Sequence, residues 1–280
     1  MERYAGREEY AAPPIALVAA EVRLAYEPSL NEPGVRDAFG AAVRERFPVR
    51  RLETTSTVTF QMVPGAPPAT EQTTSLRALT ADQTLSGRLT PTGLTVETTR
   101  YSTFDDFSDA VRYLAAATAR LLPQAVVTHV GLRYINEIRA GRDVQPGDWA
   151  RYLDPRLAGP LDLLPEATLN VLSGIAVFAP EDGVTATARW ASHVGTVVAV
   201  PLKRHGDTSG PAFVLDFDAL QELPVAAAMD AEEVAGSLRR LHHAIGTMFA
   251  ASLTVDAHRL FRGDSPAATP GGPVQEGTGK

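Results

Sequence analysis

Alternation of apolar and polar residues predicts strands along much of the chain. The clearest case begins at Ile15, where a run that is apolar on both faces gives way to Val22 and Leu24 alternating with Glu21 and Arg23, so that one face becomes polar. Runs rich in β-branched residues, separated by Gly and Pro, predict the other strands. The predicted strands cover residues 15–26, 49–63, 74–100 (three short strands), 125–138, 168–179, 183–190, 196–204 and 211–218.

Apolar residues that recur every three to four positions predict three main helices. The first begins at Pro33, a residue that suits the first helical position. The second is capped by Ser102 or Thr103, and the third begins at a capping box formed by Asp230 and Glu233. These helices cover residues 33–47, 104–121 and 231–254, and a shorter helix is predicted at 148–153.

The order of these elements predicts an α+β protein of two similar halves, each a twisted antiparallel sheet with a long amphipathic helix packed across one face. Antiparallel strands followed by one long helix occur in residues 74–121, and the same order returns in residues 168–254. Clustered Gly and Pro residues predict a connection between the halves and a disordered C-terminal tail. The predicted divisions are a flexible N-terminus (1–10), an N-terminal half (11–140), a connection (141–167), a C-terminal half (168–262) and the tail (263–280).

Composition and charge exclude several classes of function. The chain has 280 residues, with 26 Lys and Arg against 33 Asp and Glu, a net charge of −7, and no cysteine. Without cysteine it has no thiolate nucleophile, iron–sulfur cluster or cysteine zinc site. An acidic balance does not suit general nucleic-acid binding. The sequence lacks the apolar core of a signal peptide and any run of about 18 apolar residues, so we expect a cytoplasmic protein without membrane contact.

No motif of a common enzyme class is present. The patterns G-x-S-x-G, G-x-G-x-x-G and H-E-x-x-H are absent from the sequence. Only His242 and His243 of the six histidines are adjacent, and neighbours on a helix point about 100° apart, so they cannot hold one ion together. We therefore expect no cofactor, and we favour a protein without enzymatic activity.

Polar residues in the strand over 125–138 are the first candidates for a ligand site. Tyr134 and Asn136 fall on one face, and Arg133 and Glu137 fall on the other. Arg133 and Glu137 could form an anion-binding or acid–base site, or a cross-strand ion pair with Glu21 and Arg23 if the two strands are neighbours. Asn136 lies on an otherwise apolar face, and we expect its amide to tie down a nearby loop. The candidate ligand-binding residues are Glu21, Arg23, Arg133, Tyr134, Asn136 and Glu137.

Asp216 and Asp218 are the second candidates, because two carboxylates two residues apart share one face of a strand. Together they could hold a hard cation or share acid–base work. The alternative, which we favour, is the solvated face of a half-buried strand. Lys203, Arg204 and His205 end the preceding predicted strand and could pair with these carboxylates.

Four segments of the chain are similar to segments of a known protein family. They are Pro13-Pro14-Ile15 with Glu21-Val22-Arg23, Gly131-Leu132-Arg133-Tyr134-Ile135-Asn136, Leu215-Asp216-Phe217-Asp218, and the end of the final helix from Phe249 to Thr254. Together they resemble a sporadically distributed prokaryotic family of unknown function, over residues 10 to 262, although Ala12 stands where that family usually has Asn. The family has no assigned activity, so the resemblance carries over no site residue. Its scattered distribution implies an accessory role, such as defence or mobile-element functions.

Three functions follow as hypotheses. The first, which we favour, is a non-enzymatic binding protein that uses its sheets and long helices to engage a protein partner or itself. The second is a small-molecule or nucleotide binder, with or without catalysis, whose site lies between the halves and in which Arg23, Arg133 and Glu137 converge. The third is a metal-dependent phosphodiesterase or nuclease that uses Asp216 and Asp218.

Overall fold

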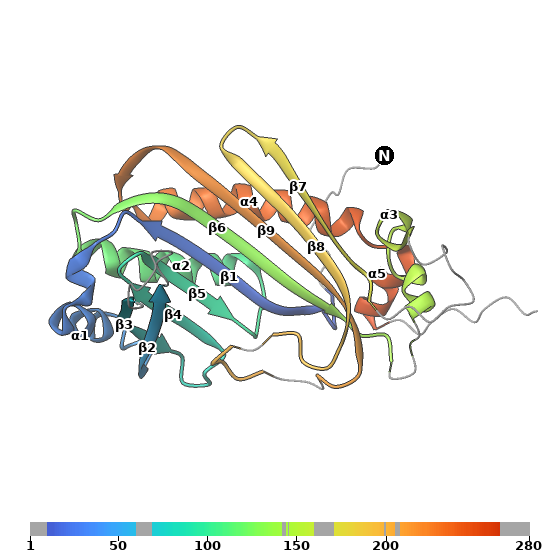
Figure 1. Cartoon of the computed structure of the whole chain (residues 1–280), viewed down its shortest axis with the longest axis horizontal. Helices are drawn as coiled ribbons and strands as arrows, with labels where there is room; N and C mark the ends of the chain where they lie inside the picture. The colour runs from blue at the N-terminus through green and yellow to red at the C-terminus, as the bar shows by residue number, and fades with distance from the viewer. Residues whose placement is uncertain are drawn as a thin grey trace, which may run out of the picture.

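Nine strands form one antiparallel sheet in the order β2-β3-β4-β5-β1-β6-β9-β8-β7 (Figure 1). The computed structural model describes residues 10–59, 69–141, 144, 146–159, 171–198, 200–204 and 208–263. The strands are β1 (Ile15–Leu24), β2 (Val49–Thr59), β3 (Ala69–Leu79), β4 (Leu85–Thr90), β5 (Gly93–Thr98), β6 (Val126–Ile138), β7 (Ser173–Glu181), β8 (Val184–Val194) and β9 (Pro211–Ala228). The α+β class predicted from the sequence is confirmed.

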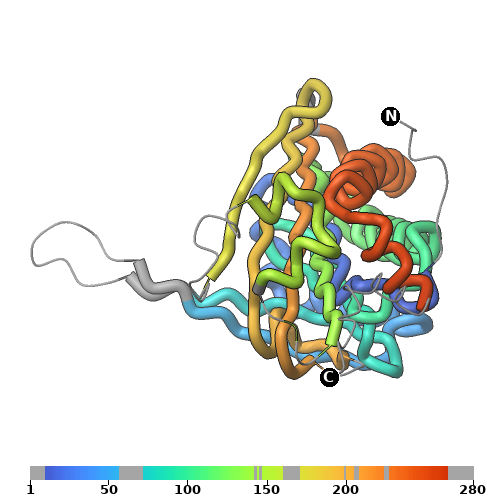
Figure 2. The backbone as a smooth tube through the Cα atoms, turned by 90° about the vertical axis from the view of Figure 1, so that its right-hand side faces the viewer, coloured from blue at the N-terminus to red at the C-terminus, as the bar shows by residue number. Residues whose placement is uncertain are grey.

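Two long helices lie side by side across one face of the sheet (Figures 1 and 2). They are α2 (Phe104–Leu121) and α4 (Ala231–Ala251). The side chain of Thr103 caps α2 by accepting from the Asp106 amide, and Asp230 caps α4 by accepting from the amides of Glu232 and Glu233, as predicted. The remaining helices are η1 (Pro28–Asn31), α1 (Pro33–Ala42), η2 (Pro146–Arg151), α3 (Pro155–Ala158) and α5 (Val255–Arg262), where η denotes a 3₁₀ helix. No described helix is long and apolar enough to cross a membrane.

The hydrophobic core lies between the sheet and these helices. Alternate residues of the central strands point into it, including Val18 and Val22 of β1 and Leu215 and Phe217 of β9, all at most 1% exposed. Because side chains alternate along a strand, the residues between them point away from α2 and α4. We call that second side of the sheet the open face; it carries Glu21, Arg133, Arg189, Asp216 and Asp218.

The two predicted halves do not form separate sheets. β1 and β6 pair at the centre of the common sheet, and β6 pairs with β9 across the predicted connection. Each long helix follows a strand that pairs with a central strand: β5, before α2, pairs with β1, and β9, before α4, pairs with β6, although β6 lies in the predicted N-terminal half. Most of the predicted tail, the first nine residues and part of the connection lie outside the described residues.

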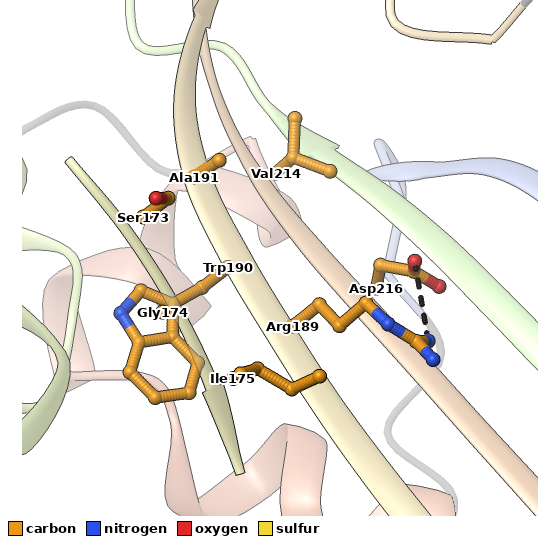
Figure 3. Close-up of a pocket in the computed structure, with 8 residues that line it drawn as sticks. All are labelled: Ser173, Gly174, Ile175, Arg189, Trp190, Ala191, Val214 and Asp216. Atoms are coloured by element: carbon orange, nitrogen blue, oxygen red, sulfur yellow. Dashed lines mark ion pairs between the residues drawn. The ribbon is translucent and has the colours of Figure 1, made fainter. Parts of the chain in front are cut away.

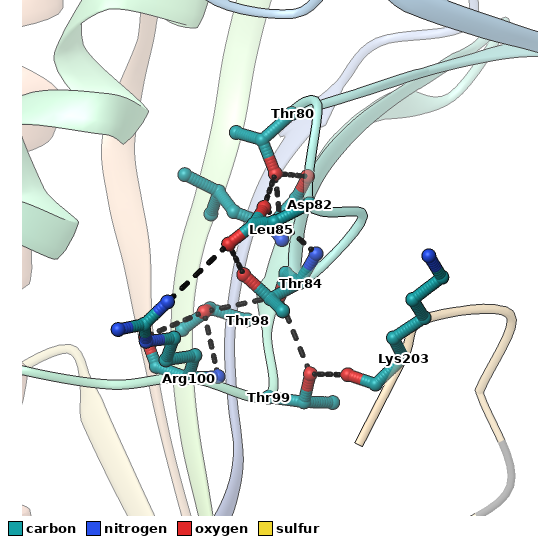
Figure 4. A network of polar contacts seen from close by, with 8 residues as sticks. All are labelled: Thr80, Asp82, Thr84, Leu85, Thr98, Thr99, Arg100 and Lys203. Atoms are coloured by element: carbon teal, nitrogen blue, oxygen red, sulfur yellow. Dashed lines mark hydrogen bonds and ion pairs between the residues drawn. The ribbon is translucent and has the colours of Figure 1, made fainter. Parts of the chain in front are cut away.

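The predicted strand at 196–204 is wrong. Its described residues pair with no strand, and they cross part of the open face instead. Val198 packs there against Leu17, Ile135 and Val214 in a small second core. The segment then reaches the ends of β4 and β5, where the Thr99 hydroxyl donates to the Lys203 carbonyl at 2.5 Å, beside a turn held by Asp82 (Figure 4).

Candidate functional site

Four charged side chains gather on the open face of β6, β8 and β9. Arg133 donates from Nε and Nη2 to the two carboxylate oxygens of Asp216, each at 2.7 Å. Arg189 lies opposite Asp216 in the strand register, with Nη1 3.8 Å from an oxygen of Asp216 and 4.0 Å from an oxygen of Asp218. We call Arg133, Arg189, Asp216 and Asp218 the charged cluster.

The two carboxylates of the charged cluster differ in environment. The prediction that both belong to a solvated face is wrong for Asp216, which is only 8% exposed and accepts two hydrogen bonds from Arg133. Burial raises the pKa of the Asp218 carboxyl, although the positive charges of Arg133 and Arg189 oppose the shift. Asp218 also lacks the direct hydrogen bonds from Arg133 that Asp216 accepts.

Arg189 is the least constrained cation of the charged cluster. Its guanidinium makes no hydrogen bond to a described residue, because the nearest carboxylate oxygens lie 3.8 and 4.0 Å away, and its side chain is 43% exposed. By contrast, the hydrogen bonds to Asp216 raise the pKa of Arg133, although partial burial opposes the shift. Arg189 thus keeps donors that another group could use.

A cavity of about 500 Å³ lies beside Arg189 on strands β7, β8 and β9 (Figure 3). Two cross-strand rows line it, Ile175–Arg189–Asp216 and Ser173–Ala191–Val214. Gly174 and Trp190 complete the lining, and the Trp190 indole lies over Gly174. The cavity therefore has an apolar floor with one arginine at its side.

Strand β7 borders this cavity and forms one edge of the sheet. No described strand pairs with its outer side, so backbone N–H and C=O groups there are open to another strand. Ile175 and Val177 are each 63% exposed and Phe178 is 50% exposed. No charged residue occurs from Val171 to Pro180. An exposed, uncharged apolar edge is the feature of a sheet that most readily accepts a further strand.

Of the candidates from the sequence, Glu21 and Arg23 pair with each other. The distance from Arg23 Nη2 to Glu21 Oε2 is 3.2 Å, and both side chains are about half exposed. β1 and β6 are neighbours, as the ion-pair hypothesis required. Arg133 nevertheless binds Asp216 of β9, the strand on the other side of β6, instead of a residue of β1.

Glu137 is buried in a separate ion pair near the end of β6. It lies 2.9 Å from Arg139 and 2.9 Å from Arg204, and its side chain is 5% exposed. Arg204 therefore does not pair with Asp216 or Asp218, the possibility raised by the sequence, because the 196–204 segment crosses the sheet at the level of Glu137. His205 lies outside the described residues. The structure does not bring Arg23, Arg133 and Glu137 together; each belongs to a different ion pair.

Tyr134 and Asn136 point to the helix side of the sheet. The Tyr134 hydroxyl lies 3.2 Å from the Tyr101 hydroxyl and 3.2 Å from His242 Nδ1. Asn136 Nδ2 donates to the Leu215 carbonyl at 3.1 Å, so the amide is bonded to the neighbouring strand and the expectation that it ties down a loop is wrong. Both residues support the core rather than the open face.

Sequence reasoning missed Arg189, Ile175 and Trp190. Arg189 alternates with apolar residues between Ala186 and Ala191, a pattern that places it on the same face as Thr187 but does not identify its neighbours. The exposure of Ile175 depends on β7 being an edge strand, and no local sequence pattern distinguishes an edge strand from a central strand of a sheet.

Asp216 and Asp218 share a face, as the metal hypothesis required. Both oxygens of Asp216 accept from Arg133, and within the described ranges no three His, Asp or Glu side chains are grouped to hold one ion. This geometry favours an ion-pair cluster over a cation site.

Comparison with known proteins adds no relative to this picture. No protein-family model matches the chain, and no curated protein matches its sequence.

Proposed function

We propose that this chain is a non-enzymatic binding protein that engages a protein partner, or a second copy of itself, by strand addition at β7. The observation that carries the proposal is the uncharged edge from Ser173 to Phe178, with Ile175 and Val177 each 63% exposed. Backbone hydrogen bonds to an added strand supply affinity, and contacts with alternate side chains supply specificity. The accessory role implied by the family resemblance is compatible with such a binding protein.

The cavity supports the same proposal, because it lies on the open face directly inside β7. A strand added to β7 would place alternate side chains beside Ile175, which lines the cavity. Apolar side chains at those positions would cover Ile175 and extend the apolar floor made by Ala191 and Val214.

We also propose that the chain consists of two similar halves. The matching strand order, with β1 next to β5 and β6 next to β9, supports this view, with the second half beginning at β6 rather than at residue 168. The halves then differ in their outer edges. β2 carries Arg50, Arg51 and Glu53, charges of the kind that discourage strand addition, whereas β7 carries none from Ser173 to Ala179.

Site-specific photo-crosslinking tests the proposed function. A photo-reactive amino acid is placed at Ile175 in one variant and at Leu52 in another, and adducts formed in host cells are identified by mass spectrometry. Leu52 is the matched control because it is an apolar residue, 67% exposed, on the opposite edge strand. Specific protein adducts at position 175, with few at position 52, are expected. Equal adducts at both positions, or none at 175, would overturn the proposal.

A second candidate function is the binding of a small anion with an apolar body. Arg189 favours it, because its guanidinium has unused donors beside an apolar cavity of about 500 Å³. Calorimetric titration with octanoate and with adenosine monophosphate tests this function in the wild type and in Arg189→Met. Binding that Arg189→Met abolishes would support it, and the absence of heat with either probe would count against it.

A further inference from the structure

The part of β7 that precedes Pro180 has Ala176 at its midpoint. Its regular pairing with β8 begins at Ser173 and is interrupted after Phe178, and Pro180, which has no N–H to donate, follows Ala179. Ala176 is the midpoint of residues 173–179. A two-fold axis at Ala176 would therefore pair the whole segment with the same segment of another copy, running antiparallel.

Such a pairing matches side chains of similar chemistry on both faces. Ile175 would lie opposite Val177 of the second copy on the open face, where both are exposed in the single chain. On the helix side, Gly174 would lie opposite Phe178 of the second copy. The Trp190 indole already covers Gly174, so the two aromatic rings would pack together.

Charge does not oppose this arrangement. The nearest acidic residue, Glu181, would lie opposite Val171 of the second copy, so no like charges would face each other. The equivalent self-pairing of β2 would bring the charged residues Arg50, Arg51 and Glu53 into the interface. The two edges of one sheet thus differ in their ability to pair with themselves.

We infer that the protein forms a two-fold symmetric dimer in which β7 pairs with β7 of a second copy about Ala176, which makes one continuous sheet. This inference rests on the proposed function of β7 and names the partner. It also completes the cavity, because the row Ile175–Arg189–Asp216 would continue into Val177 of the second copy. Each cavity would then be bordered by residues of both chains.

The absence of native cysteine makes the axis directly testable. In Ala176→Cys the two thiols would face each other across the axis, so mild oxidation is expected to give a covalent dimer on a non-reducing gel. Ser56→Cys, in the other edge strand, is the control and is expected to remain monomeric on the gel. Failure of Ala176→Cys to crosslink faster than Ser56→Cys would overturn the proposed register.

Sedimentation equilibrium tests the dimer without a new thiol. The wild type is expected to dimerise, and Val177→Lys, which sets two lysines beside apolar side chains, is expected to weaken the dimer about tenfold or more. Leu52→Lys makes the same kind of change on β2 and is expected to leave dimerisation unchanged. A wild type that stays monomeric at high concentration would overturn this inference. Photo-crosslinks from position 175 that join this protein to other proteins, and never to a second copy of itself, would also overturn the dimer. They would still support the proposed function of β7.

Discussion

Arg133 in β6 holds Asp216 in β9 by two parallel hydrogen bonds, each 2.7 Å long. The carboxylate side chain is 11% exposed, whereas the arginine side chain is 45% exposed. The bidentate geometry therefore fixes a carboxylate that has little access to water. It also leaves Arg189, on the other side of Asp216, without a hydrogen-bonded partner among the described residues.

Arg133→Met is expected to lower the free energy of unfolding by about 1.5–3 kcal/mol, because it leaves Asp216 buried without its charge-assisted hydrogen bonds. Urea denaturation at neutral pH measures the loss. Arg23→Met is the matched control: Arg23 pairs with Glu21 on the same face, but both side chains are about half exposed, so the expected loss is below about 1 kcal/mol. Equal losses in the two variants would show that the Arg133–Asp216 pair has no special role.

Gly174→Ala is expected to destabilise the protein by about 1–3 kcal/mol, because an added Cβ would lie 2.3 Å from Cζ2 of Trp190 and would displace the indole. The displacement is measured by tryptophan fluorescence in a Trp149→Phe background, where Trp190 is the sole indole. Gly236→Ala in α4 is the control, since a Cβ there meets nothing within 4 Å; it is expected to stabilise by about 0.5–1 kcal/mol. Unchanged Trp190 emission in Gly174→Ala would contradict the close packing of the two residues.

Local patterns were sufficient to predict the three main helices and most strands, but not η1, α3 and α5 or the neighbours that make the site. The caps Thr103 and Asp230 and the alternation in β6 are short-range signals, and each predicted its element. The Arg133–Asp216 pair joins residues 83 positions apart, and only the adjacency of β6 and β9 brings them together. The β-branched run that includes Val197 and Val198 was misinterpreted as a strand, because such residues signal burial as readily as strand pairing.

Asp218→Asn is expected to change how stability depends on pH. Burial raises the pKa of Asp218 above its ordinary value of 3.8, so the folded state retains this proton to higher pH than the unfolded chain does. Proton binding by Asp218 therefore stabilises the folded state. This stabilisation is fully present when the pH is below 3.8, and it is lost as the pH rises through the raised pKa of the folded state. The variant should therefore gain stability relative to the wild type between about pH 3 and about pH 7.

Urea denaturation at the two pH values checks this gain. Asp37→Asn, at an exposed position of α1, is the control and should show no comparable change relative to the wild type. A difference between Asp218→Asn and the wild type that stays constant across this range, or that reverses in sign, would contradict the raised pKa.

Arg77→Met is expected to cost about 3–5 kcal/mol, because it leaves two carboxylates without their shared cation. Arg77 is 4% exposed, and its guanidinium lies 2.6 Å from Glu53 Oε1 and 2.5 Å from Glu97 Oε2. Arg77→Lys should also destabilise, since an ammonium cannot reproduce the fork of the guanidinium. Arg100→Met is the control: Arg100 is 71% exposed and 3.7 Å from Asp82, so a loss below about 1 kcal/mol is expected in thermal or urea unfolding. A loss that small in Arg77→Met would contradict a role for the buried cation.

Tyr134→Phe tests whether a hydrogen bond in the core affects stability without affecting dimerisation. Burial raises the pKa of the Tyr134 phenol well above its ordinary value, so the hydroxyl stays protonated and keeps its hydrogen bond to Tyr101, with His242 at the same distance. Removing the hydroxyl should lower the free energy of unfolding by about 0.5–1.5 kcal/mol. Tyr26→Phe, at a position that is 63% exposed, should lower it by less. Because Tyr134 points to the helix side, neither change should alter dimerisation in sedimentation equilibrium. A dimer weakened by Tyr134→Phe would mean that the helix side, and not the β7 edge alone, governs association.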